Sequence, residues 1–143
     1  MRIRLASFSF FSSVFYLALI LMSIPAFSRA QAISAVYDQN GNTNAVYYVN
    51  ASGHIQQLYM DTSWHVGWDA TNNLAAPAAV PGSAVAAVYD VDGNANAVYY
   101  VNASGHIQQL YTDTRWNVGW DFTTGLQAPA AAGGSAIAAV YES

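Results

Sequence analysis

Apolar and polar residues alternate in short runs along this chain, and the same runs recur 52 residues later. Tyr37, Tyr89 and Tyr141 are each 52 residues apart. The stretch NAVYYVNASGHIQQLY stands at 44–59 and again, letter for letter, at 96–111. A fixed period of this length indicates a repeat architecture, in which each unit is one supersecondary module that stacks on its neighbours.

Four strands are predicted in each unit, over the segments AVYD, NAVYYVN, HIQQLY and, in the first unit, WHVGWD. These segments are short, rich in Val, Ile, Tyr and Trp, and bounded by Asn, Gly and Asp. In the last one, strand alternation places Trp64, Val66 and Trp68 on one face. No window beyond the N-terminal region has a convincing helical period, because Pro77 and Pro81 interrupt the Ala-rich stretch that follows.

The fold class expected from this pattern is all-β, built from β-propeller blades. Two four-stranded antiparallel repeats of 52 residues, at 31–83 and 84–135, precede the first strand of an incomplete third repeat at 136–143. Two blades cannot close a ring of the usual four or more. Either copies of the chain assemble, three of them giving six blades, or the chain is a piece of a longer array. A two-sheet fold that never closes would leave aromatic faces exposed to water.

Residues 1–30 are predicted to be an export signal. Arg2 and Arg4 form a basic start, an apolar core follows, and Ser28-Arg29-Ala30 offers a cleavage site. The apolar run is also long enough to be a membrane anchor. In both cases we expect the folded part to lie outside the cytoplasm, secreted or in a periplasmic or extracellular location.

The net charge and the lack of cysteine exclude several kinds of partner and site. Beyond residue 30, Arg115 is the only Lys or Arg against eight Asp and Glu, so the net charge of that part is about −7. Such a chain has no basic surface for nucleic acid. The absence of cysteine excludes disulfides and thiolate metal sites.

The run AVYYVNASGHIQQLY, followed by a Trp-rich strand, resembles the blades of the fucose-specific lectin family, six-bladed propellers of fungi and bacteria. In that family an Arg and a Glu or Gln bind the sugar hydroxyls, while a Trp or Tyr stacks on the sugar ring. Some bacterial members have two blades per chain and form trimers. The resemblance therefore implies a sugar-binding propeller and a homotrimer.

Carried over by position, the family's Glu or Gln falls on Gln57 and Gln109, and its stacking residue on Trp64 and Trp116. The family's Arg falls on an alanine in both units. Alanine has none of the guanidinium donors, so fucose specificity is not expected. Tyr59 and Tyr111 share a strand face with the Gln residues. The candidate ligand-binding residues are thus Gln57, Tyr59, Trp64, Gln109, Tyr111 and Trp116.

Each of these residue types also has a structural interpretation. Indoles bind the C–H face of sugars, but Trp is also common in cores between blades. The adjacent Gln56 and Gln57 point to opposite faces, so that a ligand hydroxyl or an inter-blade hydrogen bond must satisfy the inward one. We favour Trp64 and Trp116 over Trp68 and Trp120 as sugar-stacking residues.

Two further patterns are assigned no chemical role. Gly53-His54 followed by Trp68-Asp69 resembles the WD40 signature, but the separation is too short and the period too long. The acidic and amide residues at 90–96 are typical of a hairpin turn and lack the spacing of a calcium loop. The sequence predicts no metal and no cofactor.

Repetition of the candidate residues favours binding over catalysis. Duplicated sites raise avidity in a binding protein, whereas an enzyme needs one asymmetric constellation. A carboxylate pair for glycoside hydrolysis would have to include Asp61 or Asp69. The sequence therefore predicts no enzyme but an exported, lectin-like protein that binds a monosaccharide unit of glycans at repeated inter-blade clefts. The alternative is a structural or protein-interaction propeller fragment without a sugar site.

Overall fold

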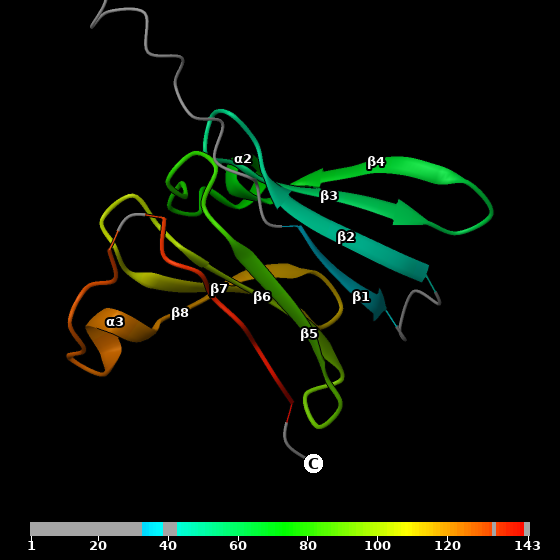
Figure 1. Ribbon diagram of the computed structural model, residues 1–143. Helices are drawn as coiled ribbons and strands as arrows, with labels where there is room; N and C mark the ends of the chain where they lie inside the picture. The colour runs from blue at the N-terminus through cyan, green and yellow to red at the C-terminus, as the bar shows by residue number, and fades with distance from the viewer. Residues whose placement is uncertain (1–32, 39–42, 133, 142–143) are drawn as a thin grey trace, which may run out of the picture.

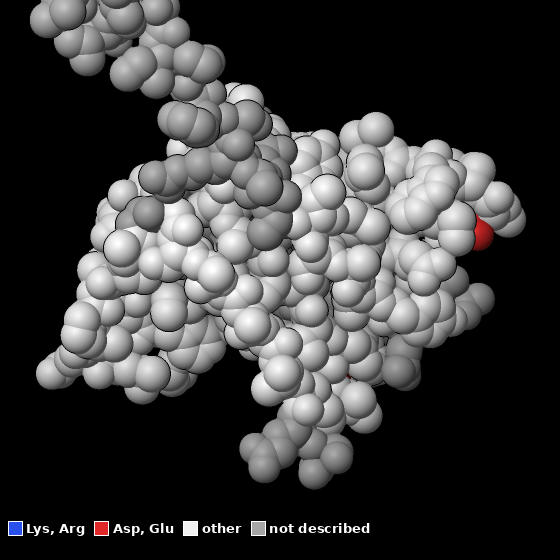
Figure 2. Space-filling view, in the orientation of Figure 1, with Lys and Arg blue, Asp and Glu red and all other residues white. Residues whose placement is uncertain are grey.

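A computed structural model describes residues 33–38, 43–132 and 134–141 of the chain. The export segment expected over 1–30 lies outside these residues. Within them, no helix has the length and apolar character needed to cross a membrane. The face of the molecule seen in Figure 2 carries almost no charged side chains, as the low content of Lys, Arg, Asp and Glu implies.

Two four-stranded antiparallel sheets make up the fold (Figure 1), and they confirm the predicted all-β blades. In each sheet the strands follow one another in sequence order, so every connection is a hairpin. The first sheet contains β1 (Ser34–Asp38), β2 (Thr43–Val49), β3 (Ile55–Met60) and β4 (Trp64–Asp69). The second sheet contains β5 (Val85–Asp90), β6 (Ala95–Val101), β7 (Ile107–Thr112) and β8 (Trp116–Asp121).

Each sheet ends in one short helix that the sequence analysis did not predict. Helix α2 (Ala70–Leu74) follows β4, and α3 (Phe122–Gly125) follows β8. The carboxylate of Asp69 accepts a hydrogen bond of 2.9 Å from Asn72 N and so caps α2. One turn of helix is too short to produce a visible 3.6-residue period, and the signal for it was the capping aspartate.

The two sheets pack face to face. Although their strands have nearly the same sequence, each sheet uses the opposite strand face for this contact. Tyr47 in the first sheet is 1% exposed, whereas its repeat equivalent Tyr99 is half-buried. The neighbouring tyrosine shows the reverse, because Tyr100 is 0% exposed and Tyr48 is half-buried. The second sheet therefore lays its Tyr100 face on the Tyr47 face of the first. Each large apolar side chain buried in this way contributes about 1.5–3 kcal/mol.

Polar contacts fix the relative position of the sheets. Ser34 Oγ in β1 accepts a hydrogen bond of 2.8 Å from Ala87 N in β5. The buried hydroxyl of Tyr100 donates to Pro77 O, in the loop between the sheets, at 2.6 Å. Burial raises the pKa of this hydroxyl well above its usual range, so Tyr100 remains a neutral donor.

The segment at 136–141 takes no strand conformation in the structure, although the repeat predicts one there. A first strand pairs with the second strand of its own sheet, as β1 does with β2 and β5 with β6. The described part of the chain offers 136–141 no such second strand. Instead, the segment runs beside the second sheet (Figure 1). Its residues Ile137 and Val140 help to line an apolar hollow of about 460 Å³ together with Tyr99, Ile107 and Phe122.

Candidate functional site

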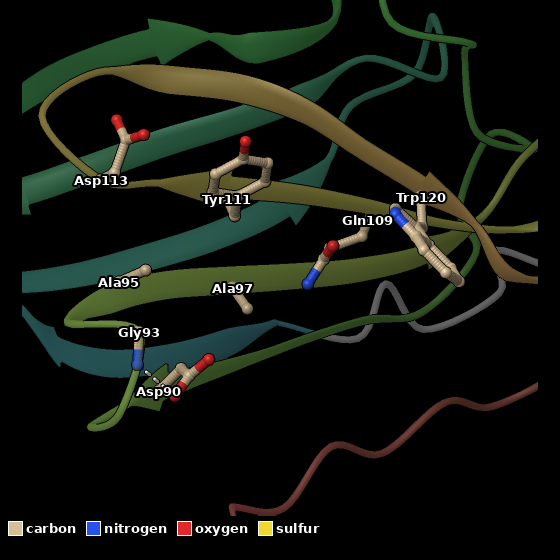
Figure 3. Close-up of a pocket in the computed structure, with 8 residues that line it drawn as sticks. All are labelled: Asp90, Gly93, Ala95, Ala97, Gln109, Tyr111, Asp113 and Trp120. Atoms are coloured by element: carbon tan, nitrogen blue, oxygen red, sulfur yellow. Dashed lines mark hydrogen bonds between the residues drawn. The ribbon is translucent and has the colours of Figure 1, made fainter.

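A cavity of about 320 Å³ opens on the free face of the second sheet (Figure 3). Its floor comes from β6 and β7, the β5–β6 and β7–β8 turns form one end, and Trp120 of β8 stands at the opposite end. We call it the second-sheet cavity, and its lining residues are Asp90, Gly93, Ala95, Ala97, Gln109, Tyr111, Asp113 and Trp120. Two of the predicted site residues, Gln109 and Tyr111, are therefore brought together here.

Trp120 joins this cavity because of a β-bulge. Between β7 and β8 the register shifts, so that Leu110 lies opposite Val118 but Gln108 lies opposite Asp121. The extra residue on β8 turns Trp120 toward the face of Gln109. Strict alternation had placed the second Trp of each repeat on the face of the first, and this expectation is wrong for that reason.

Gln108 holds the bulge in place. Its buried side-chain Nε2 donates to three carbonyl groups, Gln109 O at 3.2 Å, Gly119 O at 3.1 Å and Trp120 O at 3.2 Å. Only 3% of this residue is exposed. Gln108 thus has a structural role, and Gln109 is the residue of this pair that faces the cavity.

Glycine at position 119 makes room for the cavity-facing glutamine. A Cβ atom at Gly119 would lie 2.4 Å from Gln109 Oε1, and one at Gly67 would lie 2.6 Å from Gln57 Oε1. The Gln109 carboxamide is oriented from its other end, because its Nε2 donates to the Tyr99 hydroxyl at 3.2 Å. The sequence analysis missed this glycine, which carries no chemistry of its own.

Both carboxylates of the cavity are anchored by the turns that carry them. Asp90 Oδ1 accepts a hydrogen bond of 2.9 Å from Gly93 N. Asp113 Oδ1 accepts one of 3.0 Å from Arg115 N and others from Thr114 N and the Asn117 side chain. The backbone hydrogen bond from Arg115 lowers the pKa of Asp113, so this carboxyl stays ionised at neutral pH.

The two predicted stacking residues have different surroundings. Trp116 is partly buried and packs edge-on against Tyr47 of the first sheet, with ring centroids 5.7 Å apart. Since Gln57 Nε2 donates to the same Tyr47 hydroxyl at 3.2 Å, Gln57 and Trp116 meet at the junction of the sheets. Trp64 is 57% exposed, because the described part of the chain places no sheet against this face of the first one. A single chain therefore does not bring Trp64 to Gln109.

The tyrosines differ in the same way between the repeats. Tyr59 stacks on His65 at 5.0 Å, and His65 Nε2 lies 3.0 Å from Asp61 Oδ1. Backbone hydrogen bonds, above all from Ser63, lower the pKa of Asp61 to about 2. In the second sheet Tyr111 lines the cavity, and an asparagine replaces the histidine.

The Gly-His and Trp-Asp pattern, to which no role was assigned, does form a paired structure. His54 Nδ1 lies 2.8 Å from Asp69 Oδ2, and His106 repeats this with Asp121 at the same distance. The pair ties the start of the third strand of each sheet to the cap of the following helix. Within the described ranges, no three His, Cys, Asp or Glu residues gather closely enough to hold a metal ion.

Comparison with solved structures identifies the architecture. The SapL1 lectin, solved in complex with alpha methyl fucoside, matches 66% of this chain at 22% identity with a TM-score of 0.52. The two sheets resemble propeller blades of fucose lectins. The match covers 30% of SapL1, so the chain spans about a third of that lectin.

A fucose lectin from Kordia zhangzhouensis, solved with methyl-fucoside, is similar over 62% of each chain at 20% identity with a TM-score of 0.42. No family model matches the chain. No curated protein matches it either.

Proposed function

We propose that the protein is a lectin-like carbohydrate-binding protein that holds a monosaccharide unit of glycans at each of its repeated clefts. The observation that carries this proposal is the second-sheet cavity, in which the Gln109 carboxamide lies beside the Trp120 indole. An indole offers an apolar face for the C–H groups of a sugar, and the amide offers a partner for its hydroxyls. The volume is at the lower end of the range for small-ligand sites.

The junction of the two sheets supplies the second cleft of the proposal. There Gln57 and Tyr59 come from the first sheet and Trp116 from the second. The same arrangement would arise at Gln109 and Tyr111 if a second copy placed its first sheet on the free face of the second sheet. Trp64 of that copy would then take the position that Trp116 has within one chain.

We therefore propose a homotrimer, in which three chains supply six blades and close the ring. Trp64 and Val66, which are 57% and 78% exposed, lie on the face that this contact would cover. Head-to-tail contacts of this kind produce closed rings when the rotation between copies allows it. We place the protein outside the cytoplasm, because residues 1–30 have the pattern of an export signal.

Neither cleft is proposed to be selective for fucose. Ala45 and Ala97 occupy the position at which the fucose-specific lectin family carries its sugar-binding Arg. Calorimetry should therefore detect weak or no binding of methyl fucoside. Tight binding would show that other donors replace the guanidinium.

A glycan array tests the proposed function. The wild-type chain should bind a subset of glycans, Trp120→Ala should weaken that binding, and Trp120→Ala combined with Gln57→Ala should abolish it, while thermal unfolding stays cooperative. Val118→Ala is the matched control, because Val118 lies on the same strand but does not line the cavity. Undiminished glycan binding in Trp120→Ala would refute the assignment of this cavity.

The second candidate function is a structural or protein-interaction module without a sugar site. The packing of Trp116 against Tyr47 favours it, since this indole contributes to the core between the sheets. On this alternative, the wild-type array would be blank although the protein is folded.

A further inference from the structure

We infer that the second-sheet cavity selects a cationic amino sugar, a 2-amino-2-deoxyhexose unit with a free amine, over the N-acetylated and the acidic sugars. This inference rests on the proposed function and names the ligand class of the same site. The cavity, the indole and the carboxamide define where a sugar would lie. The charges around them decide which sugar it is.

The lining of the cavity is rich in hydrogen-bond acceptors. Asp90 and Asp113 each commit Oδ1 to turn amides, and no bond to either Oδ2 atom is found within the described part of the chain. Gln109 donates one of its two Nε2–H groups to Tyr99 and keeps Oε1 as an acceptor. A ligand that satisfies this set must bring donors, and an ammonium group brings three.

No positive side chain balances the two carboxylates. The lining residues include neither Lys nor Arg, and Ala97 stands where the resembling family has its Arg. Arg115 follows Asp113 in sequence, yet it forms no ion pair with any carboxylate that the structure describes. A ligand ammonium would therefore gain charge-assisted hydrogen bonds, which are about twice as strong as neutral ones. A uronic acid would meet like charge.

The aromatic wall suits the same ligand. Trp120 is 65% exposed, so its indole is open to a ligand. Trp120 lies at the end of the cavity opposite Asp90 and Asp113, so a sugar ring can pack on the indole while its amine points toward the carboxylates. The first sheet differs at this point, because His65 contacts the equivalent Asp61. The amine preference should accordingly be strongest at the second-sheet cavity.

The test compares two tetrasaccharides of equal length, β-1,4-linked glucosamine and its fully N-acetylated counterpart, by calorimetric titration of the full chain. The glucosamine tetramer should bind at least about tenfold more tightly, and added salt should reduce this ratio. Asp90→Asn and Asp113→Asn should each lower the ratio severalfold. Asparagine retains the oxygen that accepts the turn amides, so these variants should fold.

Two control variants distinguish binding of the amine at this cavity from a general attraction of cationic sugars to an acidic protein. Asp92→Asn removes one charge from the same β5–β6 turn, at a residue that does not line the cavity, and should leave the ratio unchanged. In a Gln57→Ala background, which removes the junction cleft, Trp120→Ala should abolish binding of both sugars. Loss of the preference in Asp92→Asn, or its survival in Trp120→Ala, would overturn the inference.

The remaining outcomes distinguish this inference from the function on which it rests. Equal affinity for the two tetramers, or tighter binding of the acetylated one, would refute the amine preference and leave carbohydrate binding intact. Failure of the folded chain to bind any glycan would refute both.

Discussion

At the scale of single residues, the cavity depends as much on an absent side chain as on those present. Gln109 can face the cavity because Gly119 leaves space next to its Oε1 atom. Position 119 lies in the bulge that also brings Trp120 to this face. The amide and the indole are therefore positioned by the same local distortion of β8.

We expect Gly119→Ala to weaken glycan binding by about tenfold or more, because the new Cβ would displace the Gln109 carboxamide. The measurement is a calorimetric titration, with thermal unfolding recorded alongside. Gly125→Ala is the matched control, because a Cβ there would make only ordinary contact with Trp120, at 3.8 Å. Unchanged affinity in Gly119→Ala would mean that Gln109 does not bind the sugar.

At the scale of elements, β8 and its equivalent β4 differ most from the sequence expectation. All eight strands could be predicted, because they are rich in β-branched and aromatic residues and are bounded by Asn, Gly and Asp. The bulge could not be predicted, since it depends on Gln108 reaching carbonyls of β8 across the sheet. For this reason the sequence predicted Gln109 and Tyr111 as candidate ligand-binding residues of this cavity, whereas it did not predict Trp120 and Gly119.

Gln108→Ala should destabilise the fold by about 1–3 kcal/mol, because three carbonyls of the bulge would lose their buried donor. Urea unfolding monitored by fluorescence would measure this change. The neighbouring Gln109→Ala should cost less, about 0.5–1.5 kcal/mol, since it removes one partly exposed hydrogen bond. Equal effects of the two substitutions would show that the bulge does not depend on Gln108.

The carboxylates that cap the helices should make the stability of the fold depend on pH in the acid range. Hydrogen bonds, first from Thr124 N and then from His106, lower the pKa of Asp121 to about 2. A carboxyl whose folded pKa is depressed stabilises the protein above its unfolded pKa of about 4, and this contribution is lost as the pH falls toward 2. Asp121→Asn should flatten the fall in thermal unfolding temperature between these pH values. An unchanged pH profile would exclude the role assigned to this cap.

At the scale of the whole molecule, the two described sheets bury one face of each against the other. The remaining face of each sheet is uncovered by any other described sheet, and these two faces are of the kinds that pack together at the junction. The free face of the first sheet repeats the residues that the second sheet buries, and the free face of the second sheet carries the cavity. Sequence periodicity alone could predict that such faces exist. It could not show which repeat would leave which face open, because the strands of the two repeats have nearly the same sequence.

Val66→Glu should keep the chain monomeric while leaving it folded, because a carboxylate would have to be buried in the proposed contact between copies. Wild-type protein should scatter light as a trimer. The control Val91→Glu, on the β5–β6 turn, changes a similarly exposed valine and should remain a trimer. A monomeric wild type would reject the ring.

Binding stoichiometry tests the central claim, that each repeat contributes one glycan cleft, most directly. Calorimetric titration of the trimer with a glycan that it binds should give two sites per chain. Gln57→Ala and Gln109→Ala should each reduce this to one, and the double variant should leave none. A stoichiometry unaffected by either substitution, or a folded chain that binds no glycan, would contradict the account.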